Sequence, residues 1–411
     1  MSVESGKDQE PDGDRDRRSP TDLEPGVPPG RVGAVAGPPP FGEFEEEGAN
    51  AAVGLARPRG GRPLVQVEKL TKLYPVKGGV FSEARFVHAV EDASFYIRRA
   101  ETLGLVGESG CGKSSLGRAV IRLSEPTFGR IFFDGKDLMK MPEGELRATR
   151  RRMQIVFQDP YGSLNPRMTV RDIVGEGISV FRLAQSRGEA DDKIAAILHR
   201  VGLRPEVMAR YPHEFSGGQR QRIGIARALA VEPEFIVCDE PVSALDVSVQ
   251  AQIVNLLTEL QEQLSLSLLF ISHDLRVVQW VSHRVAVMYL GRIVEMGPTA
   301  EVAAKCYHPY SRALFSAVPE DPRAGEVRAQ PPRGPQRRGL TAKENGRPRR
   351  VLEGEPPSAL DPPKGCVFHP RCPKAEKGKC DVETPVLHEV VPGSHHRVAC
   401  WHPEIDELTP A

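Results

Sequence analysis

The sequence predicts an α/β fold, in which helices cover a largely parallel sheet. Three observations support this prediction: short apolar runs typical of buried parallel strands, an amphipathic helical segment between two such runs, and a glycine-rich turn directly after the first run. The chain has 411 residues, of which 39% are hydrophobic. That is enough for two to three domains with sizeable cores.

The composition argues against several classes of protein. The 55 basic side chains balance the 55 acidic ones, so the formal net charge is zero and general nucleic-acid binding is not expected. No apolar run reaches the roughly 18 to 20 residues that a membrane helix needs, and the polar first residues are unlike a signal peptide. We therefore expect a soluble protein of the cytoplasm.

The first 62 residues differ from the rest of the chain. They contain 9 Pro and 11 Gly, 12 acidic and 8 basic side chains, and no periodic apolar pattern. Because such a segment buries too little apolar surface to offset the entropy cost of ordering it, we expect residues 1–62 to be disordered.

The folded part is expected to begin near Leu64. Apolar and polar residues alternate over 64–76 and 86–99, which predicts two antiparallel strands, and the apolar run 102–106 predicts a buried parallel strand. Residues 249–264 predict a helix, and 267–272 another buried strand. One face of that helix carries Ile253, Leu256, Leu257, Leu260 and Leu264.

Two further segments follow. Residues 320–350 are rich in Pro and Gly and carry nine basic side chains against four acidic ones, so we expect a solvated linker, with binding to an anionic membrane surface as a less favoured alternative. Residues 351–411 hold four of the seven cysteines and are expected to form a small module.

The strongest motif is GESGCGKSS at residues 107–115, which follows the strand 102–106 and precedes a helix expected to begin near Ser114. Its glycines let successive backbone N–H groups point at phosphate oxygens, and the helix dipole adds partial positive charge. Lys113 would bridge the outer phosphates, and the hydroxyl of Ser114 would bind magnesium. The other nucleotide-binding residues of this phosphate loop are Gly107, Glu108, Ser109, Gly110, Cys111, Gly112 and Ser115.

A pair of carboxylates follows the apolar run at 235–238. Asp239 would lie at the carboxyl end of a strand and hold magnesium, and Glu240 would polarise the attacking water as a general base. An acidic pair after a strand is a weak signal by itself. Its place downstream of a phosphate loop strengthens it considerably.

Between these two motifs, the run SGGQ precedes a predicted helix and offers a second anion cradle. Together, the phosphate loop, this run and the acidic pair resemble the ATP-binding cassette (ABC) family over about residues 64–319. The four residues of the run are Ser216, Gly217, Gly218 and Gln219.

The resemblance implies a P-loop NTPase cassette at residues 63–319, with a RecA-like parallel core, an antiparallel β subdomain and a helical subdomain at about 160–228. It also implies that two ATP-binding subunits dimerise head to tail, so the SGGQ run of one subunit closes over ATP held by the other. ATP and Mg²⁺ are the implied cofactors.

The resemblance assigns further roles, one residue at a time. Tyr74 would stack on adenine, Gln158 would reach magnesium and the attacking water, and His273 would contact the γ-phosphate. Asp246, in the SALD run at 243–246, would meet the opposite subunit. Without the family context, an aromatic residue in a strand or a histidine after one would more often be structural.

Three segments, at residues 158–170, 308–314 and 352–372, are similar to the ATPase subunits of oligopeptide and dipeptide importers, most closely the F-type subunit. This implies ATP hydrolysis that drives peptide import through two separate transmembrane permease subunits, with a second ATPase subunit in a homo- or heterodimer and an extracytoplasmic solute-binding protein. The chain would lie peripherally on the cytoplasmic face of the membrane. Nickel, glutathione or another small solute is an alternative cargo, and a non-transport ABC ATPase acting on DNA or ribosomes is a less favoured one.

The clustered cysteines are Cys366, Cys372, Cys380 and Cys400. In a cytoplasmic chain, four thiols so close in sequence favour metal ligands over disulfides. They lack the C-x-x-C pairs usual in zinc sites. The importer resemblance implies a 4Fe-4S cluster. The two alternatives are a zinc ion, whose ligand set nearby histidines would complete, and thiols that bind no metal.

Overall fold

The computed structural model describes residues 61–76, 85–317, 352 and 354–404. The expected disordered segment 1–62 and the expected linker 320–350 lie outside the described residues, except for residues 61 and 62.

The larger of the two sheets has eight strands among the described residues, in the order β11-β12-β10-β9-β3-β8-β7-β6. The five from β9 to β6 pair in parallel, and the other three continue the sheet antiparallel. Every residue of β3, β7 and β8 is buried, as the apolar runs in the sequence predict. The strands are β3 (Thr102–Val106), β6 (Met153–Val156), β7 (Phe235–Asp239), β8 (Ser267–Ile271), β9 (Arg284–Tyr289), β10 (Arg292–Pro298), β11 (His388–Glu389) and β12 (Arg397–Val398).

The second sheet is antiparallel, in the order β2-β1-β4-β5. Its two long strands are the ones that the alternating pattern predicts, and they pair in the register Val65 to Ile97 and Val67 to Phe95. Alternation buries one face of each strand against the core. The strands are β1 (Val65–Val76), β2 (Arg85–Ile97), β4 (Phe128–Phe133) and β5 (Lys136–Asp137).

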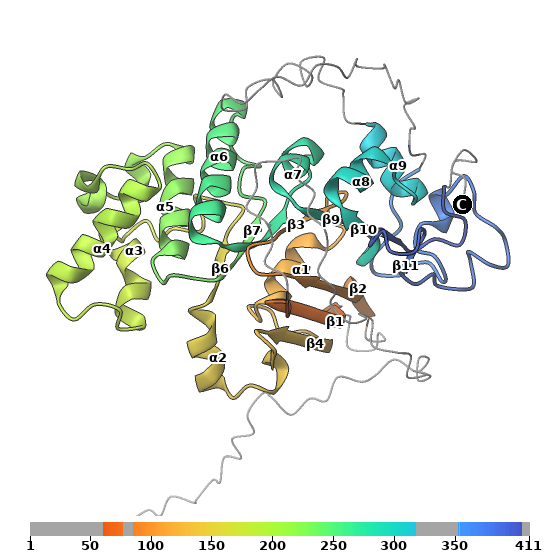
Figure 1. Cartoon of the computed structure of the whole chain (residues 1–411), viewed down its shortest axis with the longest axis horizontal. Coiled ribbons are helices and arrows are strands. Elements are labelled where there is room, and N and C mark those ends of the chain that lie inside the picture. Colours follow the sequence, from red (N-terminus) through yellow and green to blue (C-terminus); the bar gives the residue numbers. More distant parts are fainter. Residues whose placement is uncertain (1–60, 77–84, 318–351, 353, 405–411) are drawn as a thin grey trace, which may run out of the picture. The chain divides into compact units, whose positions relative to one another are not determined.

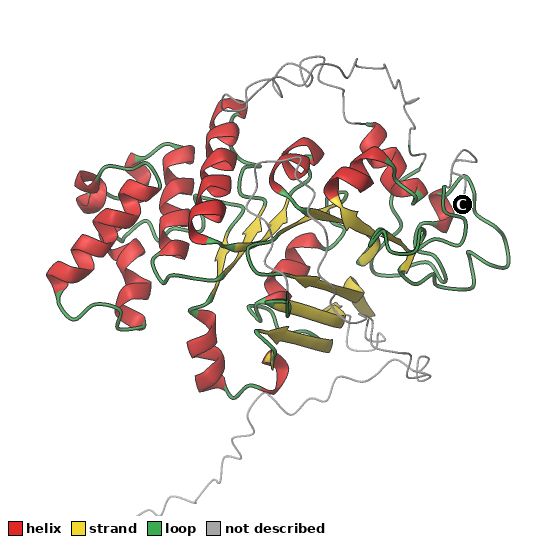
Figure 2. Cartoon of the chain, viewed as in Figure 1, coloured by secondary structure: helices red, strands yellow, loops and turns green. Residues whose placement is uncertain are grey.

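Helix α1 (Lys113–Val120) lies between the two sheets and contacts strands of both (Figure 1; Figure 2). Leu116, Ala119 and Val120 are fully buried there, in one core cluster with residues of both sheets. This packing places the N-terminus of α1 directly after the turn that leaves β3.

Several of the remaining helices begin at side-chain caps. Thr169, Ser186, Ser216, Asp246 and Asp274 each accept a backbone N–H in the first turn of the helix that they precede. Helices α3, α4 and α5 pack on one another (Figure 1). The helices are α2 (Glu143–Arg150), α3 (Val170–Val180), α4 (Arg187–Arg200), α5 (Gly217–Leu229), α6 (Val247–Leu264), α7 (Leu275–Val281), α8 (Thr299–Ala304) and α9 (Pro309–Ser316).

The described part of 351–411 is continuous with the larger sheet. Strand β12 pairs with β10, and the backbone N–H of Ala399 donates to the carbonyl oxygen of Val294 at 2.8 Å. Phe368 is 1% exposed and belongs to the same core cluster as the helices beside the parallel strands. The segment therefore shares its core with the helices and strands that precede it in the chain.

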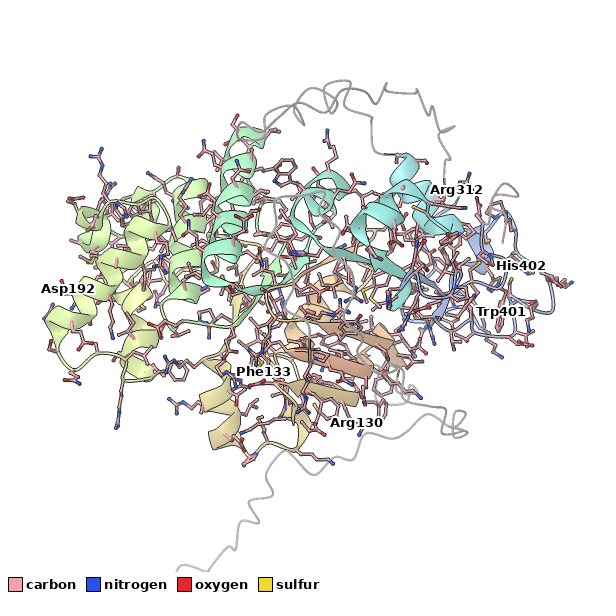
Figure 3. The ribbon with its side chains drawn as sticks, in the orientation of Figure 1. Arg130, Phe133, Asp192, Arg312, Trp401 and His402 are labelled. Carbon is pink, nitrogen blue, oxygen red and sulfur yellow. The ribbon has the colours of Figure 1, made fainter. Side chains whose placement is uncertain are left out.

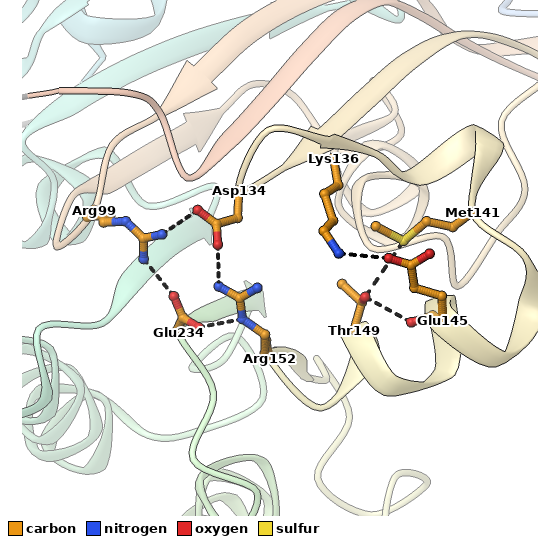
Figure 4. Close-up of polar contacts among 8 residues, drawn as sticks. All are labelled: Arg99, Asp134, Lys136, Met141, Glu145, Thr149, Arg152 and Glu234. Carbon is orange, nitrogen blue, oxygen red and sulfur yellow. Dashed lines mark hydrogen bonds and ion pairs between the residues drawn. The ribbon is translucent and has the colours of Figure 1, made fainter.

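Four charged side chains join the two sheets in a closed ring (Figure 4). Arg99 lies 2.5 Å from Asp134 and 2.6 Å from Glu234, and Arg152 lies 2.7 Å from Asp134 and 2.5 Å from Glu234. Hydrogen bonds from Arg152, above all, hold the pKa of both carboxyl groups below their usual range. The ring ties the turns after β2 and β4 to the starts of β6 and β7.

Candidate nucleotide site

The phosphate loop connects β3 to α1, as its sequence predicts. Gly110 and Gly112 have φ of 78° and 105°, in the left-handed region that favours glycine. At Gly112 a Cβ atom would lie 1.9 Å from the carbonyl oxygen of Ala89, so no other residue fits. Lys113 is 4% exposed, and its ammonium donates to the carbonyl oxygens of Gly107 at 2.8 Å and Glu108 at 3.0 Å.

Two residues expected at a magnesium site are in contact. The hydroxyl of Ser114 lies 2.6 Å from Oδ1 of Asp239, which is fully buried at the carboxyl end of β7. Arg118 lies 3.4 Å from the other carboxylate oxygen. A hydroxyl beside a carboxylate is an oxygen donor set of the kind that Mg²⁺ prefers, so the residues present fit the ion.

Three residues predicted from separate motifs meet at one carboxylate oxygen. Oε2 of Glu240 lies 3.0 Å from Nε2 of Gln158 and 3.3 Å from Nδ1 of His273. Each residue follows the carboxyl end of a strand, β7, β6 and β8 respectively, and these strands are neighbours in the parallel sheet. Glu240 has a φ of 45°, a costly conformation for a residue with a side chain and one that is common at functional sites.

Gln158, Glu240 and His273 line one cleft of about 900 Å³ together with Lys113 and Ser114, whereas the buried Asp239 is not part of its wall. Tyr74 lies on its wall near the end of β1, with 37% of its surface exposed, and its expected stacking on adenine remains a prediction. Other wall residues were not predicted from the sequence: Val87, Ala89, Asp159, Ser243, Ala244 and Ala359. The small apolar residues among them carry no sequence signal of ligand binding, and Ala359 is far away in the chain.

The SGGQ run and Asp246 do not line this cleft. Ser216 and Gln219 form a capping box on α5: the Ser216 hydroxyl accepts the N–H of Gln219, and the Gln219 side chain accepts the N–H of Ser216. Asp246 caps α6 by accepting the N–H of Val249 at 3.0 Å. Their expected role on the nucleotide of a second subunit remains a prediction.

The clustered cysteines do come together. Cys366, Cys372, Cys380 and Cys400 line one enclosed cavity of about 10 Å³, beside His369 and His402. Burial raises the pKa of Cys366, and it raises the pKa of Cys400 to about 12. These two thiols are therefore protonated at neutral pH.

The expected metal site at these cysteines is not supported. Among residues 61–76, 85–317, 352 and 354–404, no group of three or more Cys, His, Asp or Glu side chains is placed to hold a metal ion. In the same described ranges, no helix is both long and apolar enough to cross a membrane.

Comparison with known proteins gives consistent results. Residues 90–243 match the family described as ABC transporter, and residues 294–346 and 340–380 match the C-terminal region of oligopeptide/dipeptide transporters. A probable peptide ABC transporter ATP-binding protein of Sinorhizobium fredii is 50% identical over 338 residues, which cover 82% of this chain and 89% of that protein. The oligopeptide transport ATP-binding protein AppF of Bacillus subtilis is 48% identical, with 82% and 96% covered.

Solved structures are similar as well. The structure of cbiO1 from Clostridium perfringens, part of an ABC transporter complex, has a TM-score of 0.51 and 28% sequence identity, covering 59% of this chain and 91% of that one. A dimeric ATP-binding cassette in a post-hydrolysis state with ADP and Pi has a TM-score of 0.51 and 29% identity, covering 57% and 98%.

Proposed function

The chain belongs to the ATP-binding subunits of the ABC transporter family, and we propose that it hydrolyses ATP to drive the import of peptides through separate membrane subunits. The observation that carries this proposal is the convergence of Gln158, Glu240 and His273 beside the phosphate loop. The chain is thus an ABC-type ATPase, as the sequence resemblance implies.

The geometry supports a defined role for each group in hydrolysis. ATP would place its phosphates on the loop, where Lys113 exchanges two backbone carbonyl partners for phosphate oxygens. Ser114 and Asp239 would hold Mg²⁺, which supplies positive charge against the phosphates. Glu240 would orient water and accept its proton, and His273 and Gln158 would position that carboxylate.

A working transporter needs further chains. The SGGQ run and Asp246 lie outside the cleft of their own chain, which suits contact with ATP held by a second subunit, and a dimeric cassette is among the similar structures. We expect a homo- or heterodimer of ATPase subunits on two transmembrane permeases at the cytoplasmic face, supplied by an extracytoplasmic solute-binding protein. Phosphate release would reopen the dimer.

Peptide is the cargo that the relatives' names support, and the match to the oligopeptide/dipeptide transporter C-terminal region favours transport over a role on DNA or ribosomes. The test is reconstitution of the chain with its permeases and binding protein in liposomes. ATP-dependent uptake of labelled di- or oligopeptides would support the proposal. Uptake of nickel or glutathione instead would change the cargo, and ATP turnover that drives no uptake would contradict the transport function.

We also propose that the four clustered cysteines bind a 4Fe-4S cluster. A cluster spaces its thiolates further apart than a single ion does, so it does not need three ligands at single-ion distances, which the described residues do not provide. The support is their shared enclosed cavity. Protein purified without oxygen should be brown and contain iron and acid-labile sulfide, and Cys372→Ser should lose both. Stoichiometric zinc would establish the zinc alternative, and the absence of both metals would leave four thiols that bind no metal.

A further inference from the structure

The C-terminal segment contacts the nucleotide site at two points, one on the wall of the cleft and one on the phosphate loop. Ala359 lines the cleft, and its carbonyl oxygen accepts the N–H of His88 on β2 at 2.8 Å. Twelve residues later (371 minus 359), Arg371 contacts the phosphate loop itself. Nothing in the roles assigned above uses either contact.

Arg371 binds the side chain of Glu108, the second residue of the phosphate loop. Its Nη1 lies 3.1 Å from one carboxylate oxygen and 3.4 Å from the other, and it donates to the hydroxyl of Tyr289 at 3.4 Å. The Arg371 side chain is 6% exposed and that of Glu108 is 27% exposed. A charge-assisted bond between such partly desolvated groups is stronger than one at the surface.

Aromatic packing keeps Arg371 in place. It ends a 3-10 helix (His369–Arg371) that follows Phe368. The Phe368 ring packs edge-on against Tyr289 at 5.2 Å between centroids and lies 5.6 Å from Tyr310. The guanidinium is therefore held by a rigid core, at a small entropy cost for each contact it makes.

Glu108 is held from three sides. Its N–H donates to the hydroxyl of Tyr310 at 2.9 Å, its carbonyl oxygen accepts from Lys113 at 3.0 Å, and its carboxylate binds Arg371. Tyr310 is fully buried in α9, so this partner is also fixed. Residues more than 200 positions later in the chain thus set the conformation of this loop residue.

The charge of Glu108 makes these contacts relevant to binding. A carboxylate on a loop that receives a triphosphate repels its ligand, and the repulsion is strong in a partly buried site. The guanidinium of Arg371 balances that charge and holds the carboxylate on the C-terminal side of the loop.

We propose that Arg371 is a positioning residue for ATP binding: it neutralises and holds Glu108, so that nucleotide affinity depends on the C-terminal segment. This inference deepens the proposed function, because it takes the phosphate loop to be the ATP site.

The test measures binding of a fluorescent ATP analogue, with Mg²⁺, to the full chain. In Arg371→Gln the Kd should rise about five- to tenfold, because Glu108 is left unbalanced. In the assembled transporter, KM for ATP should rise while kcat stays within about twofold, because the affected contact is made before the transition state. Arg371→Lys keeps the charge and should recover most of the affinity.

A second substitution separates this role from a structural one. In the double variant Arg371→Gln, Glu108→Gln, the repelling charge is gone, so the Kd should return to within about twofold of the wild type. If Arg371 only stabilised the fold, removing Glu108 would not restore binding.

Arg312 offers a matched control (Figure 3). It lies on α9 and forms an ion pair with Glu404. This pair also joins the cassette to the C-terminal segment, but it involves no residue of the phosphate loop. Arg312→Gln should lower the Tm without changing the Kd for nucleotide. Wild-type affinity in Arg371→Gln, or weak binding that Glu108→Gln does not restore, would overturn the inference. Failure of the wild-type chain to bind ATP would instead contradict the proposed function.

Discussion

Glu240 illustrates how single residues acquire their role from their surroundings. Its backbone is left-handed at φ 45°, and its carboxylate has Gln158 and His273 as neighbours. A side chain held in one orientation by two neighbours is prepared to position water, which is the property a general base needs.

Glu240→Gln should therefore abolish hydrolysis and keep binding. Gln has nearly the same shape but cannot accept a proton, so turnover in the assembled transporter should fall about 10²- to 10⁴-fold while ATP still binds.

Lys113→Ala should behave differently and weaken nucleotide binding itself, because the ammonium of Lys113 would contact the phosphates. ATPase rates and nucleotide titrations measure both effects, and equal turnover in Glu240→Gln and wild type would remove Glu240 from its role.

Gly112 allows a prediction about loop geometry. Gly112→Ala should lose nucleotide binding, because the new methyl group would lie 1.9 Å from the carbonyl oxygen of Ala89. Gly110→Ala is the matched comparison: its φ is also positive, but a Cβ atom there has no neighbour within 4 Å. Nucleotide titration should show the smaller loss for Gly110→Ala, and the opposite order would contradict the steric argument.

At the scale of elements, the charge ring of Arg99, Asp134, Arg152 and Glu234 holds the antiparallel sheet against the parallel one (Figure 4). The members retain 34% to 40% side-chain exposure, so water screens them. A network of this kind contributes more to the free energy of unfolding than an isolated ion pair at the surface does, but it is less strongly coupled than a fully buried network.

Arg152→Gln should lower the free energy of unfolding by about 1 to 2 kcal/mol at pH 7, after allowing for that screening. The difference in free energy of unfolding between Arg152→Gln and the wild type should become smaller at acidic pH. Because the folded-state pKa values of Asp134 and Glu234 are lowered, their contribution is present above their unfolded pKa values of about 4 and is lost as pH falls through the folded ones.

Urea denaturation at a series of pH values measures this dependence. Arg130→Gln is the control, because Arg130 pairs with Glu68 but is 59% exposed, and its loss should cost less than about 1 kcal/mol at any pH. A difference for Arg152→Gln that does not vary with pH would show that the ring contributes through packing alone.

At the scale of the whole molecule, one buried carboxylate joins the C-terminal segment to the cassette. Glu295 on β10 is fully buried and accepts the N–H groups of Tyr307 at 2.7 Å and His308 at 3.1 Å. It also lies 2.7 Å from Nε2 of His396, which directly precedes β12. Burial lowers the pKa of His308 to about 4, so this neighbouring ring is neutral at pH 7.

Glu295→Gln should destabilise the full chain by about 1 to 3 kcal/mol, because the amide places a donor where backbone donors need an acceptor. Chemical denaturation gives the size of the effect, and limited proteolysis should show faster cleavage within 354–404. Glu301→Gln, at an exposed position on α8, should stay within about 0.5 kcal/mol of wild type. Equal proteolysis of Glu295→Gln and wild type would contradict the anchoring role.

The sequence by itself determined the local parts of this protein: the alternating strands of the antiparallel sheet, the buried strands β3, β7 and β8, helix α6 and the phosphate loop. These follow from backbone geometry and burial within a few neighbouring residues, which a local pattern records. The candidate catalytic residues Gln158, Glu240 and His273 also follow from short motifs, because each lies within two residues of the end of its strand.

Only the tertiary structure decided which distant residues contact these motifs. Contacts such as Arg371 with Glu108 and Ala359 with His88 join residues more than 250 positions apart, and neither partner has a local pattern that reveals the other. The pairing of β12 with β10 likewise depends on β12, a strand of two residues that carries no periodic signal. Such contacts depend on which surfaces the whole chain buries together, and a local sequence pattern does not record that choice.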